Sequence, residues 1–317
     1  MTRTVASTIM VICLATVGTS AACPIRASVA ARDGYVDAGG GVRLFYRTVG
    51  SGRDTVVVLH GGPGFTMDYL AADLEPLAAR HTLLFYDQRG TGRSTLVTDS
   101  AALDGQRFVE DLEAIRSHFK LQHLTLLAHS WGAAVAALYS AAHPQRVGRL
   151  LLVDPISVRR VYHAQGLASL DSRRDSTTRL RLRDLGAARL ANPGDAAACR
   201  AYFGLWFVAT FADTAALRRS RGDFCAGTSE ALANKIKSVD RFTLRSLGDW
   251  DWRPALRAVT APALVIRGTM DHVPLESARE WEAALPNGRL LSLERSGHFP
   301  YLELPEQFFA AAADFLQ

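Results

Sequence analysis

The chain has 317 residues, of which 48% are hydrophobic and 21% charged, a composition typical of folded globular proteins. Its formal net charge is +5, and arginine carries almost all of the positive charge because lysine occurs only at Lys120, Lys235 and Lys237. Basic residues do not alternate with aromatic ones in a block, which argues against a nucleic-acid-binding protein. The length suits one α/β domain that carries an insertion.

Residues 1–30 have the layout of a secretory signal. Arg3 is followed by an apolar or small run over 5–22 and by small residues at "TSAAC" and "ASVAA". A membrane anchor is the alternative, but the run has about the minimum length for a span and lacks a strong charged stop. We therefore expect residues 1–30 to be removed, which leaves an exported periplasmic or extracellular protein without an integral membrane segment.

The cysteines raise two further expectations. "SAAC", which ends at Cys23, resembles a lipoprotein box, although Ser20 stands where that pattern prefers Leu, so a lipid anchor on Cys23 stays an alternative. Cys199 and Cys225 are candidates for a disulfide, because an exported protein meets an oxidising compartment. Two buried thiols are the other possibility. The cysteines and histidines show no zinc-ligand spacing, and no metal is expected.

Strands and helices alternate along most of the chain. An early strand is expected in "VRLFYRTVG", and helices are expected over 67–80, 107–119, 131–143, 275–285 and from Pro305. Continuous apolar runs predict strands that are buried on both faces; these runs are "TVVVLHGG", "HTLLFYDQRG", "LTLLAHS", "GRLLLVDP", "PALVIRG" and "GRLLSLERSGH". This alternation predicts a mostly parallel central sheet with helices on both faces.

The alternation stops after Pro155. Residues 156–250 contain no strong β-run and instead show helical segments rich in Arg, Ala and Leu. We therefore expect a core in two parts, 31–155 and 251–317, with 156–250 inserted between them as a helical cap.

The sequence "AHSWG" places Ser130 between a predicted strand and a predicted helix. A sharp turn at that point presents a serine hydroxyl at the carboxyl edge of the sheet, as in a nucleophile elbow. Gly132 supplies the small neighbour that this turn needs, whereas Ala128 stands where glycine is usual. A simple helix cap is the alternative function for the serine, and His129 is expected to pack beside the turn.

A serine nucleophile needs a base, and the base needs an orienting acid. Asp271 in "RGTMDHVP" and His298 in "SGHFPYLE" each follow a predicted strand, on the loops where open α/β sheets place their sites. The chain order Ser, Asp, His fits this architecture. Asp154, at the end of an earlier strand, is a competing acid. His298 is preferred over His272 because Gly297 lets its loop approach the serine.

The oxyanion of a tetrahedral intermediate needs hydrogen-bond donors. One is expected from the backbone N–H of Trp131, which follows the nucleophile. The other is expected from Gly62 in "HGGPG", although glycine and proline also mark ordinary turns.

The motifs "HGGPG", "DQRGTGRS", "AHSWG", "RGTMDHVP" and "SGHFPYLE" together resemble the α/β-hydrolase fold, and within it the prolyl aminopeptidase (proline iminopeptidase) branch of serine peptidases. The resemblance extends over about 42–315, apart from the insertion. It implies Ser130 as nucleophile, Asp271 as acid, His298 as base and the cap above the pocket, without any cofactor. Asp87 and Arg89 are expected to act as loop scaffolding.

The chain departs from that branch in its cap. The family binds the amino terminus of its substrate with acidic residues, often in a "W-E" pair, whereas here Phe207 follows Trp206. Glu230, Asp213 and Asp223 are the candidate replacements, with Trp206 and Glu230 as tentative substrate-binding residues.

Three functions remain open on the sequence alone. The first is an exported aminopeptidase acting on short peptides, and the second is an esterase, lactonase or amidase that uses the same triad on small acyl substrates. The third is a non-catalytic protein that only binds a small ligand. The oligomeric state is left open.

Overall fold

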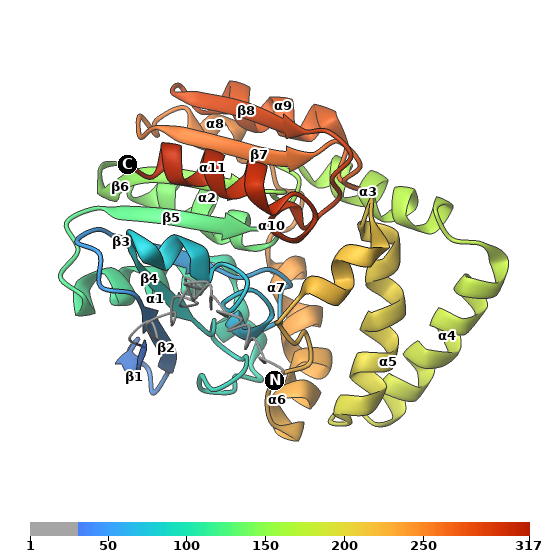
Figure 1. Ribbon diagram of the computed structural model, residues 1–317. Helices are drawn as coiled ribbons and strands as arrows, with labels where there is room; N and C mark the ends of the chain where they lie inside the picture. Colours follow the sequence, from blue (N-terminus) through green and yellow to red (C-terminus); the bar gives the residue numbers. More distant parts are fainter. Residues whose placement is uncertain (1–30) are drawn as a thin grey trace, which may run out of the picture.

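The computed structural model describes residues 31–317, so the expected signal sequence and Cys23 lie outside the described part. An eight-stranded sheet forms the centre, in the order β1-β2-β4-β3-β5-β6-β7-β8 (Figure 1). Its strands are β1 (Ala31–Asp37), β2 (Arg43–Val49), β3 (Thr55–Leu59), β4 (Thr82–Tyr86), β5 (Leu124–His129), β6 (Val147–Val153), β7 (Ala263–Gly268) and β8 (Gly288–Leu293). The carboxyl ends of the parallel strands therefore meet at one edge, which is the edge that carries the site.

The strands from β3 to β8 are parallel, while β1 and β2 add an antiparallel ribbon at one side. The expected fold, an α/β fold with a mostly parallel sheet, is confirmed. The apolar runs become central strands because both of their faces are covered. Strand β1 is not expected from the sequence, because its residues are mostly exposed and no apolar alternation marks it.

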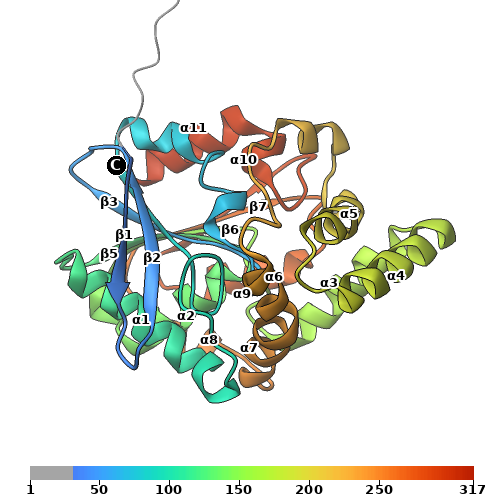
Figure 2. The same cartoon turned by 90° about the horizontal axis from the view of Figure 1, so that it is seen from below.

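Helices cover both faces of the sheet (Figure 2). One face carries α1 (Gly105–His118), α2 (Gly132–Ala142), α8 (Arg253–Leu256) and α9 (Leu275–Ala284); the other carries α10 (Pro300–Glu303) and α11 (Pro305–Phe315). Each helix buries an apolar stripe, for example Phe108 and Leu112 on α1 and Phe308 on α11. These two layers fix the sheet edge on which the site is built.

The helix expected over 67–80 is wrong. The segment forms two short 3₁₀ helices, Met67–Tyr69 and Glu75–Ala79. Pro76 has no N–H to donate and clashes with a preceding helical turn, so a continuous helix cannot pass through it. The N–H of Met67 is also held by the Asp87 carboxylate, which fixes where the first turn begins.

The segment between β6 and β7 is helical, and we call residues 156–250 the cap. Its helices are α3 (Arg160–Ser172), α4 (Ser176–Ala191), α5 (Ala196–Trp206), α6 (Ser229–Asn234) and α7 (Asp240–Ser246), with a π-helical turn at Lys235–Val239. In Figures 1 and 2 the cap lies to one side of the sheet, and α4 reaches furthest from it. The chain enters and leaves the cap through paired backbone: Arg159 and Asp251 form a β-bridge, and the N–H of Arg160 donates to the carbonyl of Trp250.

A disulfide joins Cys199 to Cys225 inside the cap. It ties α5 to the loop that precedes α6 and closes a loop of 26 residues. Such a crosslink stabilises a fold mainly by restricting the unfolded chain. Because the loop is closed within the cap, the bond restrains the cap and not its attachment to the core.

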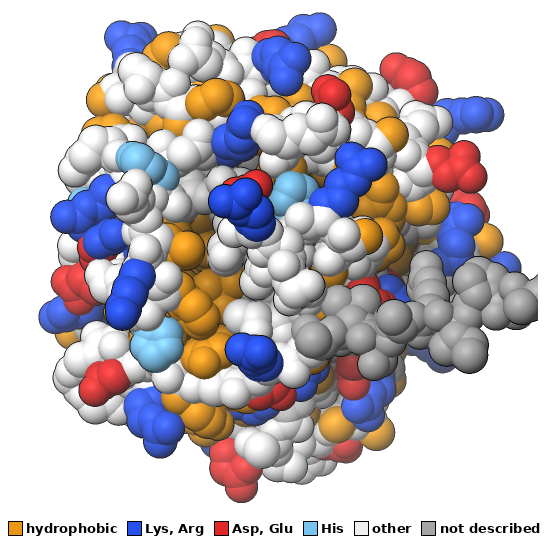
Figure 3. Space-filling view, turned by 60° about the vertical axis from the view of Figure 1, so that its left-hand side comes forward, with side chains coloured by type: hydrophobic (Ala, Val, Ile, Leu, Met, Phe, Trp, Pro, Cys, Tyr) orange, Lys and Arg blue, Asp and Glu red, His pale blue; other side chains and the backbone are white. Residues whose placement is uncertain are grey.

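None of the helices described in residues 31–317 combines the length and the apolar composition that a membrane span requires. On the face shown in Figure 3, basic side chains are scattered among acidic and apolar ones and do not form a single block.

Candidate active site

Ser130 occupies a strained turn between β5 and α2. Its φ is +54°, which a side chain other than glycine rarely adopts, and strain of this kind is concentrated at functional sites. The N–H of Ser130 donates to the carbonyl of Val153 over 3.1 Å, which fixes the turn against β6. Gly132 is required here, since a Cβ on it would lie 2.4 Å from the carbonyl oxygen of Leu59. The small neighbour expected after the serine therefore has a direct steric cause.

Three side chains form a continuous hydrogen-bonded chain at the sheet edge. The hydroxyl oxygen of Ser130 lies 3.0 Å from Nε2 of His298, and Nδ1 of His298 lies 2.9 Å from Oδ1 of Asp271. The three residues come from loops after β5, β7 and β8, as the sequence analysis expected. This arrangement allows proton transfer from a serine hydroxyl to a histidine that a carboxylate orients.

Asp271 is nearly enclosed and remains ionised. Burial acts to raise the pKa of Asp271, but the neighbouring imidazoles of His298 and His272 outweigh it and hold that pKa well below its usual range. Its Oδ1 also accepts the backbone N–H of His272 over 2.6 Å. Arg173 of the cap donates to the backbone carbonyls of Met270 and Asp271, so the cap helps to hold the acid loop.

Asp154, the competing acid, lies close to Asp271 but does not contact His298. Its Oδ1 accepts the N–H of Gly268 over 2.9 Å, while its Oδ2 is buried without a partner among the described residues. Burial, together with the negative charge of Asp271, raises the pKa of Asp154 well above its usual range. The raised pKa favours the protonated form of Asp154 beside the ionised acid.

The "HGGPG" loop after β3 runs beside Ser130. Gly62 has a φ of +132°, and a Cβ on Gly61 would lie 3.1 Å from the Cβ of Ser130. The N–H groups of Gly62 and Trp131 donate to no other group within residues 31–317. Both residues line the same pocket as Ser130. They are therefore placed where free N–H donors to an oxyanion are needed.

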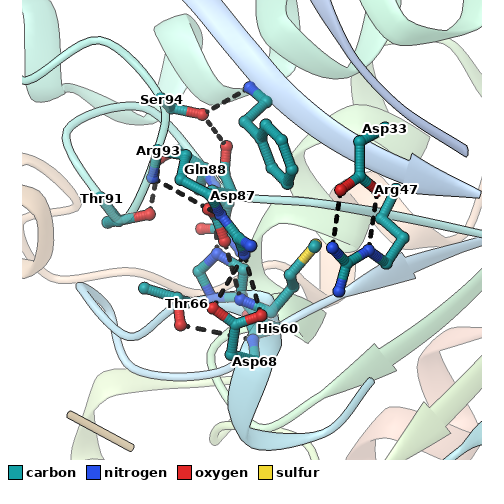
Figure 4. Close-up of polar contacts among 12 residues, drawn as sticks. Asp33, Arg47, His60, Thr66, Asp68, Asp87, Gln88, Thr91, Arg93 and Ser94 are labelled. Carbon is teal, nitrogen blue, oxygen red and sulfur yellow. Dashed lines mark hydrogen bonds and ion pairs between the residues drawn. The ribbon is translucent and has the colours of Figure 1, made fainter. Parts of the chain in front are cut away.

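The "DQRGTGRS" loop forms hydrogen bonds with residues around the site, and Figure 4 shows its polar contacts. The carboxylate of Asp87 accepts hydrogen bonds from the N–H of Met67 and from Arg93, and Arg89 forms a buried two-pronged ion pair with Asp111. Gln88 joins the two halves of the oxyanion site, since its side chain donates to the carbonyl of His60 and accepts the indole N–H of Trp131. The loop contributes scaffolding and does not reach the pocket.

The base loop is also tied to the cap, by a residue that the sequence analysis did not single out. Glu303 accepts the backbone N–H groups of Gly297, Ala212 and Asp213, at 2.7–3.1 Å. A Cβ on Gly297 would lie 2.2 Å from the carbonyl oxygen of Thr210, which explains the glycine before His298. The only available signal for Glu303 was its place in "SGHFPYLE".

The pocket above Ser130 has a volume of about 290 Å³ and a mainly apolar lining. Seven cap residues contribute, and the rest come from the core loops. No Asp, Glu, Lys or Arg belongs to the lining in the part of the chain that the structure describes. The larger apolar side chains are Phe65, Ile156, Leu167, Trp206, Phe207, Phe224, Leu244, Val273 and Phe299.

Of the two tentative substrate-binding residues, Trp206 lies in the pocket wall, whereas Glu230 is not brought to the pocket. Glu230 lies in the first turn of α6, is exposed to solvent, and does not line the pocket. A carboxylate is favourable there because of the positive end of the helix dipole. Asp213 and Asp223 also lie outside the pocket, where Asp213 caps a 3₁₀ helix and Asp223 pairs with Arg200.

Among residues 31–317, one group has metal-ligand spacing: Asp271, His272 and His298. Two of its members are joined by the hydrogen bond that orients the base, and a metal there would displace the proton on Nδ1 of His298. We therefore assign the group to the orientation of the base.

The chain is similar to known proteins in both its sequence and its fold. The family model of the alpha/beta hydrolase fold matches residues 54–305, which is most of the chain. A proline iminopeptidase of Heyndrickxia coagulans is 29% identical over 296 residues, which cover 90% of this chain and 98% of the relative. A proline iminopeptidase of Lactiplantibacillus plantarum is 29% identical over 276 residues, which cover 83% and 93%.

Among solved structures, VinJ superposes with a TM-score of 0.72 at 26% identity, covering 90% of this chain and 98% of VinJ. Together with the sheet order and the serine turn, these matches identify the family. The chain therefore belongs to the alpha/beta hydrolase fold family, as a hydrolase that resembles the aminopeptidases named proline iminopeptidase.

Proposed function

We propose that the protein is a serine hydrolase that works through an acyl-enzyme, of the aminopeptidase type that releases N-terminal residues from short peptides. The observation that carries the acyl-enzyme proposal is the hydrogen-bonded chain from Ser130 through His298 to Asp271. The similarity to proline iminopeptidases over most of their length supports the peptidase part.

The mechanism follows from the geometry. His298 Nε2 takes the hydroxyl proton of Ser130 as the oxygen attacks the acyl carbon, and the ionised Asp271 stabilises the imidazolium that forms. The free N–H groups of Gly62 and Trp131 bind the oxyanion. His298 then gives the proton to the leaving amine or alcohol. A water molecule repeats the sequence on the acyl-enzyme, releases the acid and restores the serine.

The lining of the pocket favours a second candidate. An aminopeptidase must hold the ammonium group of its substrate, and an unpaired buried charge is costly. No carboxylate lines the pocket within the described residues, and its walls are mainly aromatic and aliphatic. This observation supports hydrolysis of esters or amides whose acyl group is uncharged and apolar.

A matched pair of substrates separates the two candidates. L-Prolyl p-nitroanilide and cyclopentanecarbonyl p-nitroanilide share one leaving group and differ in the ring nitrogen. If the protein is an aminopeptidase, kcat/KM for the prolyl compound is expected to exceed that of its carbocyclic partner by about tenfold or more, a difference of about 1.4 kcal/mol. The reverse order, or turnover of p-nitrophenyl butyrate alone, contradicts the aminopeptidase proposal and supports the second candidate.

We also propose that the protein is exported. The signal-like layout of residues 1–30 and the disulfide between Cys199 and Cys225 support export, since disulfides persist in oxidising compartments. Expression of the full chain in a bacterial host, followed by cell fractionation and mass spectrometry, is expected to find a shortened chain outside the cytoplasm. An intact chain in the cytoplasm with free Cys199 and Cys225 contradicts the proposal.

A further inference from the structure

A buried polar bridge passes beneath Ser130 and joins the oxyanion loop to the base loop. The hydroxyl of Tyr69 lies 2.7 Å from the N–H of Gly61 and 2.6 Å from Nδ1 of His129. Nε2 of His129 lies 2.9 Å from the backbone carbonyl oxygen of His298. Tyr69 and His129 are only 1% and 2% exposed, so water does not replace these contacts.

The proton positions along the bridge are fixed by its two ends. The N–H of Gly61 can only donate, and the carbonyl of His298 can only accept. The hydroxyl of Tyr69 therefore accepts from Gly61 and donates to Nδ1 of His129, while Nε2 of His129 carries the hydrogen that is donated to His298. Burial, with a smaller contribution from His298, lowers the pKa of His129 to about 3, so its imidazole stays neutral.

The bridge connects the oxyanion loop with the loop that carries the base. Gly61 immediately precedes Gly62, and its N–H is held by the Tyr69 hydroxyl, whereas the N–H of Gly62 has no partner among the described residues. At the other end of the bridge, Nε2 of His129 is hydrogen-bonded to the backbone carbonyl of His298. The His129 ring also packs against Phe299 and Tyr301, at centroid distances of 5.2 and 5.6 Å, so it has little freedom to shift.

We propose that Tyr69 and His129 are positioning residues that set the distance between the oxyanion donors and the base, through the bridge from Gly61 to the carbonyl of His298. The bridge orders both groups before substrate arrives, and such preorganisation contributes to the transition state more than to ground-state binding. This inference rests on the acyl-enzyme part of the proposed function and holds for peptide and ester substrates alike.

Three variants test the bridge on the full chain. Tyr69→Phe removes one hydroxyl and keeps the ring that stacks on Phe224. We expect kcat to fall about 10- to 100-fold while KM changes less than about twofold, somewhat less than the loss of an oxyanion donor itself. His129→Leu is expected to give a similar loss. His129→Gln is expected to restore kcat to within about fivefold of the wild type, because its amide can accept from Tyr69 and donate to His298.

A boronic acid that forms a tetrahedral adduct with the serine supplies a second readout, with thermal melting as the folding control. If the bridge positions the donors, the boronate affinity falls in parallel with kcat. Unchanged kcat in Tyr69→Phe, or equal losses in the Gln and Leu variants at 129, would overturn the proposal. Failure of the proposed function is distinguishable, because the wild type would then show no covalent adduct of a fluorophosphonate on Ser130.

Discussion

Replacing Ser130 by alanine is expected to lower kcat by about 10⁴- to 10⁶-fold on whichever substrate the wild type hydrolyses best. The substitution removes the only oxygen within hydrogen-bond distance of Nε2 of His298 among the described residues, so no acyl-enzyme can form. The pocket walls are untouched, and a competitive inhibitor is expected to bind with nearly unchanged affinity. Steady-state kinetics and intact-mass analysis after fluorophosphonate treatment measure both effects.

The chain offers a matched control in the next helix. Ser140 on α2 is fully buried, and its hydroxyl has no hydrogen-bond partner within residues 31–317. Ser140→Ala should therefore leave kcat unchanged and leave stability equal or slightly higher, because an unsatisfied polar group is removed. Retention of more than a few per cent of wild-type kcat in Ser130→Ala would rule out Ser130 as the nucleophile.

Replacing Asp271 by asparagine is expected to lower kcat by about 10⁴-fold. The amide has nearly the shape of the carboxylate but no charge, so it cannot stabilise the imidazolium of His298 and can favour the wrong tautomer. The effect depends on Asp271 being ionised, as its lowered pKa indicates; burial opposes ionisation, and the two imidazoles outweigh it. The measurement is kcat as a function of pH, in which the loss should persist across the neutral range.

For the neighbouring acid, Asp154, the same substitution is expected to leave kcat almost unchanged. Burial and the charge of Asp271 raise the pKa of Asp154 and so favour its neutral form, which asparagine imitates. Asp154→Asn is expected to keep kcat within about fivefold of the wild type, since its Oδ1 contact with Gly268 can be preserved. If Asp154→Asn abolished turnover and Asp271→Asn did not, the assignment of the acid would be wrong.

Much of the site is predictable from sequence because it depends on local chemistry at strand ends. The turn at Ser130 follows an apolar strand and precedes small residues. Asp271 and His298 follow the next strands in the order that a parallel sheet brings together at one edge. The sequence also indicates Gly62 as an oxyanion donor, because it lies in a tight glycine-rich loop. It indicates a possible disulfide between Cys199 and Cys225, because an exported protein meets an oxidising compartment.

Other features depend on packing that periodicity does not reveal. The sequence places Tyr69 in an ordinary apolar segment, and only the fold brings its hydroxyl to Gly61 and His129. The sequence offers Glu230 as an acid in the cap, but whether a helical residue faces a pocket depends on how the helices pack. The helix predicted over 67–80 does not form for a more local reason, because Pro76 interrupts the helical hydrogen bonding.

The paired backbone where the cap meets the core has an evolutionary consequence. Because Arg159 and Asp251 are bridged, the chain leaves the core and returns to it at nearly the same place. A change in the length of the segment between these two residues costs little loop-closure entropy, about 0.6 kcal/mol for each doubling of its length. Seven of the 18 residues that line the pocket belong to the cap, whereas the reacting groups belong to the core. The cap and the core can therefore evolve separately. Changes in the cap alter the walls of the pocket, while the core keeps the groups that react.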